Sequence, residues 1–101
     1  MKYKLEQKIT RKNLIEFCQK NHIYKLSLFG SALHGELGPN SDIDILVEFE
    51  KEHIPGLITL VGMEIELTKM LGRQVDLRTP KDLSRHFRDD VISTAEVQYE
   101  D

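Results

Sequence analysis

The chain has 101 residues, of which 40% are hydrophobic and 31% charged, and its 14 basic and 17 acidic side chains give a formal net charge of −3. This length predicts a single domain, residues 1–101, and the composition excludes a disordered chain. Basic residues are too few and too scattered for a general nucleic-acid binder, so nucleic acid is not expected as a partner.

The first predicted element is a helix that begins after Thr10, whose hydroxyl can accept a hydrogen bond from a free amide of the first turn. Leu14, Phe17 and Cys18 share one face of this helix, and Asn21 suits a left-handed position at its end. The single cysteine excludes an intramolecular disulfide and a zinc site of several thiolates. We expect Cys18 to be a buried structural thiol rather than a nucleophile.

A strand is predicted at 23–29, because its side chains alternate between two faces until the chain reaches Gly30-Ser31. The next segment, 32–37, is long enough for one or two helical turns. Gly-Pro-Asn-Ser at 38–41 then indicates a loop.

The clearest strand is predicted at 42–49, where apolar residues alternate with Asp42, Asp44 and Glu48. Pro55 is expected at the first position of the next helix, and Gly72 at its end. This helix carries a broad apolar stripe of Leu57, Ile58, Leu60, Val61, Ile65, Leu67 and Leu71.

A third short strand is predicted at 74–79, and it is closed by Pro80. A last helix is expected from about Lys81 or Leu83 to Ala95, and the acidic end, Glu100-Asp101, is expected to be a frayed tail. The order α-β-α-β-α-β-α predicts a small α/β (α+β) sandwich, in which helices cover one sheet.

Asp42 and Asp44 are two residues apart on a predicted strand, so their side chains project from the same face. Such neighbours repel unless a cation joins them, and hard divalent ions such as Mg²⁺ prefer oxygen ligands. If the strand at 74–79 lies beside this one, Asp76 can join the pair. Three carboxylates can hold two metal ions.

Gly30-Ser31 lies between the first strand and the predicted short helix. Glycine lets the backbone approach a ligand closely, free amides at a helix start attract anions, and Ser31 adds a hydroxyl donor. A nucleoside triphosphate could bind here with its metal-facing oxygens turned towards Asp42 and Asp44.

Each of these features taken alone has an ordinary structural explanation. An Asp-x-Asp on a strand is most often the solvated face of a sheet, and most Gly-Ser pairs are turns. Their order along the chain favours a functional site. An apolar strand is followed by Gly-Ser, a short insert, a strand that opens with Asp-x-Asp, and a later apolar strand that contains one Asp.

The stretch Leu28-Phe29-Gly30-Ser31, followed by ten residues and then Asp42-Ile43-Asp44-Ile45-Leu46-Val47, resembles the signature of the minimal nucleotidyltransferases. These proteins belong to the DNA polymerase beta-like nucleotidyltransferase superfamily, and the resemblance covers nearly the whole chain. It implies an antiparallel or mixed sheet, two Mg²⁺ ions and a nucleoside triphosphate, which is expected to be ATP.

The resemblance also implies roles for individual residues. Gly30 and Ser31 would contact phosphate, Asp42 and Asp44 would bind both metals, and Asp76 would be the third metal ligand that helps to activate the attacking hydroxyl. Many minimal members are antitoxins of two-gene pairs with a helical HEPN ribonuclease, and they transfer AMP from ATP to a tyrosine of that toxin.

The sequence departs from the family pattern just after Gly30-Ser31, where many relatives have arginines. Ala32 and His34 stand there instead. The departure leaves the metal ligands in place but removes arginine contacts to phosphate, so the rate or the nucleotide preference is in question.

Other candidate sites are weaker. His22, His34, His53 and His86 have no paired spacing suited to a metal, so a histidine zinc site is not expected. Ser31 as a hydrolase nucleophile would need a histidine base in a nucleophile-elbow pattern, which the sequence lacks. Arginines 78, 85 and 88 fit a solvated face, with contacts to nucleotide or partner as the alternative.

Three functions remain open from the sequence. The first is adenylylation of a partner protein, and the second is a catalytically weak binding module that neutralises its partner by contact. The third is transfer to a small molecule such as an aminoglycoside, for which 101 residues leave little room for an acceptor domain. No run approaches the about 18 apolar residues that span a bilayer, and no apolar signal region follows the N-terminus, so a cytoplasmic protein is expected.

Overall fold

The computed structural model describes residues 5, 8–30 and 41–101, and all structural statements below concern these residues. Their helices and strands follow one another as α1 (Arg11–Lys20), β1 (Ile23–Phe29), β2 (Ile43–Phe49), α2 (Leu57–Leu71), β3 (Val75–Arg78), the 3₁₀ turn η3 (Pro80–Asp82), α3 (Arg88–Thr94) and β4 (Glu96–Glu100). The predicted short helix at 32–37 lies outside the described residues.

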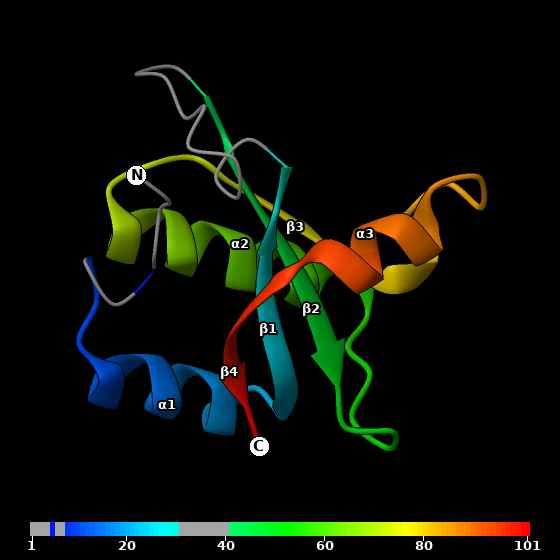
Figure 1. The fold of residues 1–101 in the computed structure, drawn as a ribbon. Coiled ribbons are helices and arrows are strands. Elements are labelled where there is room, and N and C mark those ends of the chain that lie inside the picture. The colour runs from blue at the N-terminus through cyan, green and yellow to red at the C-terminus, as the bar shows by residue number, and fades with distance from the viewer. Residues whose placement is uncertain (1–4, 6–7, 31–40) are drawn as a thin grey trace.

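The four strands form one mixed sheet in the order β3-β2-β1-β4 (Figure 1). β1 pairs antiparallel with both β2 and β4, whereas β2 and β3 are parallel. The expected α+β class with a mixed sheet is therefore confirmed. The parallel pair requires a crossover, and α2 provides it between β2 and β3.

The main core lies between the sheet and the two longer helices. Figure 1 shows α1 and α2 on the same side of the sheet, with α3 across from them. Every second residue of β2 faces this core: Ile43, Ile45 and Val47 are fully buried, and Phe49 is partly buried. From the helices the core takes Leu14, Phe17, Cys18, Met63, Leu67 and Leu71. Burial raises the pKa of Cys18 to about 12, as expected for a structural thiol.

A bulge interrupts the alternation of β1. Ile23 pairs with Phe49, but the next paired residue is Lys25, opposite Glu48, so Tyr24 is the extra residue. The bulge lets Ile23 enter the core while Tyr24 is 39% exposed.

The end of α1 differs by one residue from the prediction. Thr10 caps its start, since the Thr10 hydroxyl accepts a hydrogen bond from the Asn13 amide at 3.1 Å. Asn21 follows the last helical residue, but its φ is −102°, and the left-handed residue is His22, with φ +57°. Asn21 stays right-handed because its amide still donates to the Phe17 carbonyl at 3.2 Å, and the His22 amide donates to the Gln19 carbonyl at 3.3 Å.

The start and the exposed face of α2 also differ from the prediction. Pro55 was expected at the first helical position, but Gly56 is the N-cap and the helix begins at Leu57, whereas Gly72 ends it in the left-handed conformation as expected. Only the part of the apolar stripe around Leu67 and Leu71 is buried. Its other flank is exposed: Leu57 (76%), Ile58 (89%), Val61 (44%) and Ile65 (52%).

The C-terminal prediction was wrong in two respects. The last helix begins only at Arg88, because Thr79 and Asp82 first form a capping box around η3. The chain end is not a frayed tail, since Glu96–Glu100 forms β4, buries Tyr99 and pairs with β1. No helix among the described residues is long and apolar enough to cross a membrane.

Candidate active site

Gly30 directly follows β1 and lies against Asp44. Its φ of +69° is in the left-handed region, which favours glycine. A Cβ atom on Gly30 would collide with Oδ2 of Asp44 and would lie 3.2 Å from Cγ of that residue. Glycine is therefore needed twice, for the backbone turn and for the close approach of the carboxylate.

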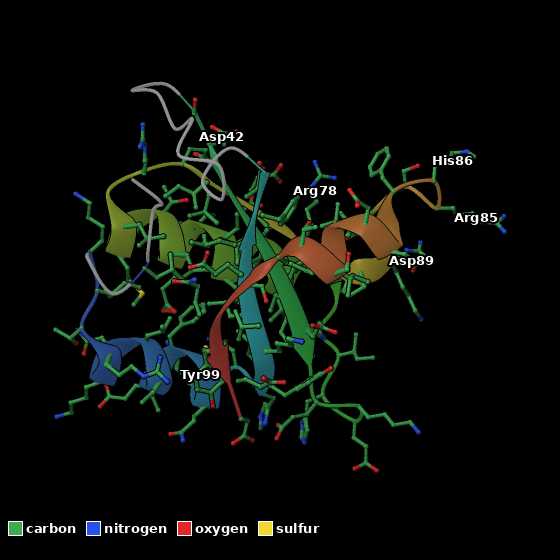
Figure 2. All side chains as sticks on the ribbon, in the orientation of Figure 1. Asp42, Arg78, Arg85, His86, Asp89 and Tyr99 are labelled. Atoms are coloured by element: carbon green, nitrogen blue, oxygen red, sulfur yellow. The ribbon has the colours of Figure 1, made fainter. Side chains whose placement is uncertain are left out.

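Asp44 on β2 and Asp76 on β3 are direct partners in the parallel register. Paired residues of neighbouring strands lie about 4.8 Å apart and point to the same face, so the condition under which Asp76 could join Asp44 is met. Both side chains are half-buried, whereas Asp42 is exposed one residue before β2. Figure 2 shows Asp42 and Arg78 towards the same end of the sheet.

The three carboxylates act on one another electrostatically. Burial raises the pKa of Asp44, and the negative charges of Asp76 and Asp42 raise it further. The positive charge of Arg78 partly opposes this effect. Arg78 donates from Nε to Oδ1 of Asp76 at 3.1 Å and from its guanidinium NH₂ to Oδ2 at 3.3 Å. The hydrogen bonds and charge of Asp76 raise the pKa of Arg78 in turn.

The carboxylate cluster fits a hard divalent cation. Its donors are all oxygens, and the raised pKa of Asp44 reflects a repulsion that a cation would relieve. Among the described residues, only His22, Glu50 and His53 bring one ligand atom each within 4.8 Å of one another, so Asp42, Asp44 and Asp76 would have to move closer together to share the metal ions that the resemblance implies.

A cavity of about 380 Å³ opens beside Asp44 and Asp76. It is of a size typical of small-molecule sites and combines apolar walls with a few charged groups. The remaining lining residues are Phe29, Arg78, Asp82, Leu83, Ser84 and Phe87. A nucleotide placed here could meet aromatic side chains and the carboxylates together.

α2 holds the strand that carries Asp76. β3 lies at the edge of the sheet, and its outward amides bond to two α2 side chains one turn apart. The Leu77 amide donates to Oε2 of Glu64 at 2.8 Å, and the Val75 amide donates to Oγ1 of Thr68 at 3.1 Å. These contacts fix the backbone on both sides of Asp76.

The segment after β3 forms the rim of the cavity. Oδ2 of Asp82 accepts hydrogen bonds from the Thr79 amide at 3.1 Å and from the Thr79 hydroxyl at 3.0 Å. Arg88 was expected on a solvated face, but it is half-buried and donates to the Leu83 carbonyl at 3.1 Å. Arg85 is exposed as expected and lies well away from Asp42 (Figure 2).

Not every predicted site residue can be placed. Ser31, Ala32 and His34 lie outside the described residues, so the Ser31 role and the consequence of the missing arginines remain predictions. Sequence reasoning did not single out Glu64 and Thr68. Their spacing of four places them on one face of the helix, but the sequence does not set them apart from Thr59, Glu66 and Lys69, the other polar residues of α2.

Comparison with known proteins gives matches over most of the chain. Residues 11–98 match the family model of the nucleotidyltransferase domain. A Methanocaldococcus jannaschii protein, provisionally named a protein adenylyltransferase, is 33% identical over 85 residues, which are 84% of this chain and 89% of that protein. Protein adenylyltransferase MntA of Thermococcus cleftensis is 39% identical over 62 residues, 61% of each chain.

Two solved structures share the fold. A crystal structure of a toxin–antitoxin complex with AMP-PNP superposes with a TM-score of 0.73 and 23% identity, over 92% of this chain and 75% of that one. The structure of a tri-AMPylated Shewanella oneidensis HEPN toxin in complex with an MNT antitoxin superposes with a TM-score of 0.64 and 21% identity, over 89% of this chain and 69% of that one. At these identities the likeness concerns the fold alone.

Proposed function

Because the chain belongs to the family of nucleotidyltransferase domains, we propose that it transfers AMP from ATP to a hydroxyl of a partner protein. The observation that carries this proposal is the pairing of Asp44 with Asp76 next to Gly30, at the mouth of a cavity of about 380 Å³. An ordinary solvated sheet face needs neither a glycine fitted to a carboxylate nor a raised carboxylate pKa.

Each residue of the site has a proposed role. Asp42, Asp44 and Asp76 would hold Mg²⁺, which supplies neutralisation of the phosphate charge and activation of the acceptor hydroxyl. Gly30 and Ser31 would place the phosphates, and Phe29 and Phe87 would shield the nucleotide from water. Arg78 would move from Asp76 to an anionic group when ATP binds, because its side chain is 48% exposed and can turn.

The proposed reaction balances as a simple displacement. The acceptor oxygen forms a bond to the α-phosphorus of ATP, and the bond from that phosphorus to the oxygen bridging to the β-phosphate breaks. Pyrophosphate leaves, and the hydroxyl proton passes to the carboxylate of Asp76. Asp76 is placed for this role because it is half-buried beside Asp44 and lines the cavity in which the nucleotide would bind.

An exposed apolar surface favours a protein as acceptor. A second cavity, of about 230 Å³, is lined by Leu57, Leu60 and Val61 of α2 and also by Asp76 and Arg78. The exposed flank of α2 is therefore continuous with the carboxylate site. A protein that lies along this flank could present a hydroxyl to Asp76, whereas a small polar molecule would leave the flank uncovered.

We propose a helical HEPN-type toxin as this partner, with the chain as its antitoxin. The proposal is supported by the fold, which is similar to that of an MNT antitoxin solved with a HEPN toxin. A helix of the partner would fit the α2 flank, because apolar side chains one helical turn apart form a continuous contact surface.

Catalysis and neutralisation by contact can be separated in one experiment. The chain, Mg²⁺ and α-labelled ATP are mixed with the partner, and the Asp42→Asn/Asp44→Asn variant is tested in parallel. If the chain is an enzyme, the wild type labels the partner covalently and the variant does not. If the variant fails to label but still binds and inhibits the partner at wild-type strength, neutralisation by contact accounts for the antitoxin effect.

A further inference from the structure

His22, Glu50 and His53 meet at the end of the sheet opposite to Gly30 and Asp44. His22 precedes β1, Glu50 follows β2, and His53 lies in the turn that leads to α2. Two backbone hydrogen bonds fix this arrangement. The Glu50 amide donates to the His22 carbonyl at 2.9 Å, and the His53 amide donates to the Glu50 carbonyl at 2.9 Å.

The side chains of these three residues also lie close together. Nδ1 of His22 lies 3.1 Å from Oε2 of Glu50, and the rings of His22 and His53 stack with centroids 3.8 Å apart and planes 9° apart. One potential ligand atom from each residue lies within 4.8 Å of the other two. The left-handed backbone of His22, with φ +57°, turns the chain at this point.

We propose that His22, Glu50 and His53 form a binding site for a divalent transition metal of the zinc class, separate from the carboxylate site. Two imidazoles and one carboxylate are the ligands that zinc takes in many proteins, and a water can complete four-coordination. Magnesium prefers an all-oxygen set such as the aspartates. The chain therefore offers two sites of different chemistry at opposite ends of its sheet.

Binding requires a small rearrangement of the side chains. Stacked rings present their edges side by side, so the rings must rotate until one nitrogen of each lies about 2.0–2.1 Å from the metal. All three residues are exposed or partly exposed, so such rotation meets little packing. The bound metal would join the start of β1 to the turn before α2.

Cobalt provides a direct probe of this proposal, since tetrahedral Co²⁺ with nitrogen and oxygen ligands absorbs in the visible range. The metal-stripped full chain is titrated with Co²⁺ and then with competing Zn²⁺, with excess Mg²⁺ and no nucleotide. We expect one equivalent of Co²⁺ to bind and Zn²⁺ to displace it. His22→Ala and His53→Ala should each weaken Zn²⁺ binding by at least about tenfold, because even the loss of an outer-shell partner can cost that much.

Matched variants make the outcome unambiguous. His86→Ala removes another exposed histidine outside the cluster, and Asp42→Asn/Asp44→Asn removes the other proposed site; both should bind Zn²⁺ like the wild type. Unchanged Zn²⁺ affinity in the His22→Ala/His53→Ala double variant would overturn the proposal, as would loss of binding in the aspartate variant. Circular dichroism checks that every variant is folded. The test uses no ATP, so its failure leaves the proposed transfer reaction unaffected.

Discussion

Asp44 on β2 is the register partner of Asp76 on β3, and the charge of Asp76 helps to raise the pKa of Asp44. The parallel pairing that α2 makes possible brings these residues together on one face. Gly30 fits against the same carboxylate from β1. Three neighbouring strands thus contribute to one small acidic site.

The fit of Gly30 against Asp44 can be tested with a matched glycine. Gly30→Ala and Gly72→Ala both place alanine at φ +69°. The new Cβ at position 30 collides with the Asp44 carboxylate, whereas a Cβ at position 72 has no atom within 4 Å. We expect Gly72→Ala to lower the free energy of unfolding by about 1–2 kcal/mol and to keep transfer activity. Gly30→Ala should lose more stability and most activity, as measured by urea unfolding and AMP transfer. Equal losses in both variants would show that the collision with Asp44 has no effect.

Ionised Asp44 should destabilise the folded chain when no divalent ion is present. Burial first, and then the charges of Asp76 and Asp42, raise its folded-state pKa, so the folded chain binds the proton more tightly than the unfolded chain. Stability should therefore fall as pH rises from the unfolded pKa through the folded pKa. At pH 7 in EDTA, Asp44→Asn should unfold at a higher Tm than the wild type, and Mg²⁺ should raise only the wild-type Tm. A lower Tm for the variant in EDTA would contradict this assignment.

Substitution of two glutamates of α2 tests whether Glu64 supports β3 by its hydrogen bond and not merely by its surface charge. Glu64→Ala leaves the buried Leu77 amide without its acceptor, which should cost about 1–3 kcal/mol and loosen Asp76. Glu66→Ala breaks only the exposed ion pair with Lys20 at 2.9 Å, worth about 0–1 kcal/mol. Urea unfolding measures both losses, and AMP transfer should fall only in the Glu64 variant. If Glu66→Ala lost as much stability and activity as Glu64→Ala, the proposed support of β3 by Glu64 would be refuted.

The exposed flank of α2 should determine partner affinity. Ile58 is 89% exposed and apolar, so Ile58→Glu should weaken binding of the HEPN-type partner by at least about tenfold, or about 1.4 kcal/mol, without unfolding the chain. Thr59→Glu adds the same charge to the adjacent exposed position, which points away from the flank, and should bind like the wild type. Calorimetry of the two variants measures the difference, and equal affinities would place the interface elsewhere.

The sequence predicted much of the fold because local signals and the final structure agree. Thr10 marks the start of α1, Gly72 ends α2, and alternation marks the strand after Asp42. The resemblance to the minimal nucleotidyltransferases is also confirmed at the level of the family. The adjacency of Asp44 and Asp76 was conditional on strand order, which no local pattern contains.

The wrong prediction for the chain end and the unforeseen contact of two histidines both arise where long-range contacts decide the structure. Val97 and Tyr99 alternate with polar residues, but a short acidic stretch after a helix becomes a strand only because β1 offers a free edge. His22 and His53 lack any metal-like spacing, and they meet because the antiparallel β1–β2 pair returns the chain to its starting end. Residue spacing along the chain could reveal neither the β1–β4 pairing nor the contact between His22 and His53.

The central claim is that the carboxylates of the sheet perform nucleotide transfer, and labelling of the partner tests it most directly. Glu48 is the matched control, because it lies on the same strand and face as Asp44 but outside the cavity, where it accepts a hydrogen bond from Tyr24 at 3.2 Å. With Mg²⁺ and α-labelled ATP, the initial rate of covalent AMP labelling is compared for the wild type, Asp44→Asn and Glu48→Gln. We predict that Asp44→Asn lowers the rate at least about a hundredfold, as expected for loss of transition-state charge stabilisation, while Glu48→Gln labels at the wild-type rate. Labelling by Asp44→Asn at the rate of Glu48→Gln would contradict the account.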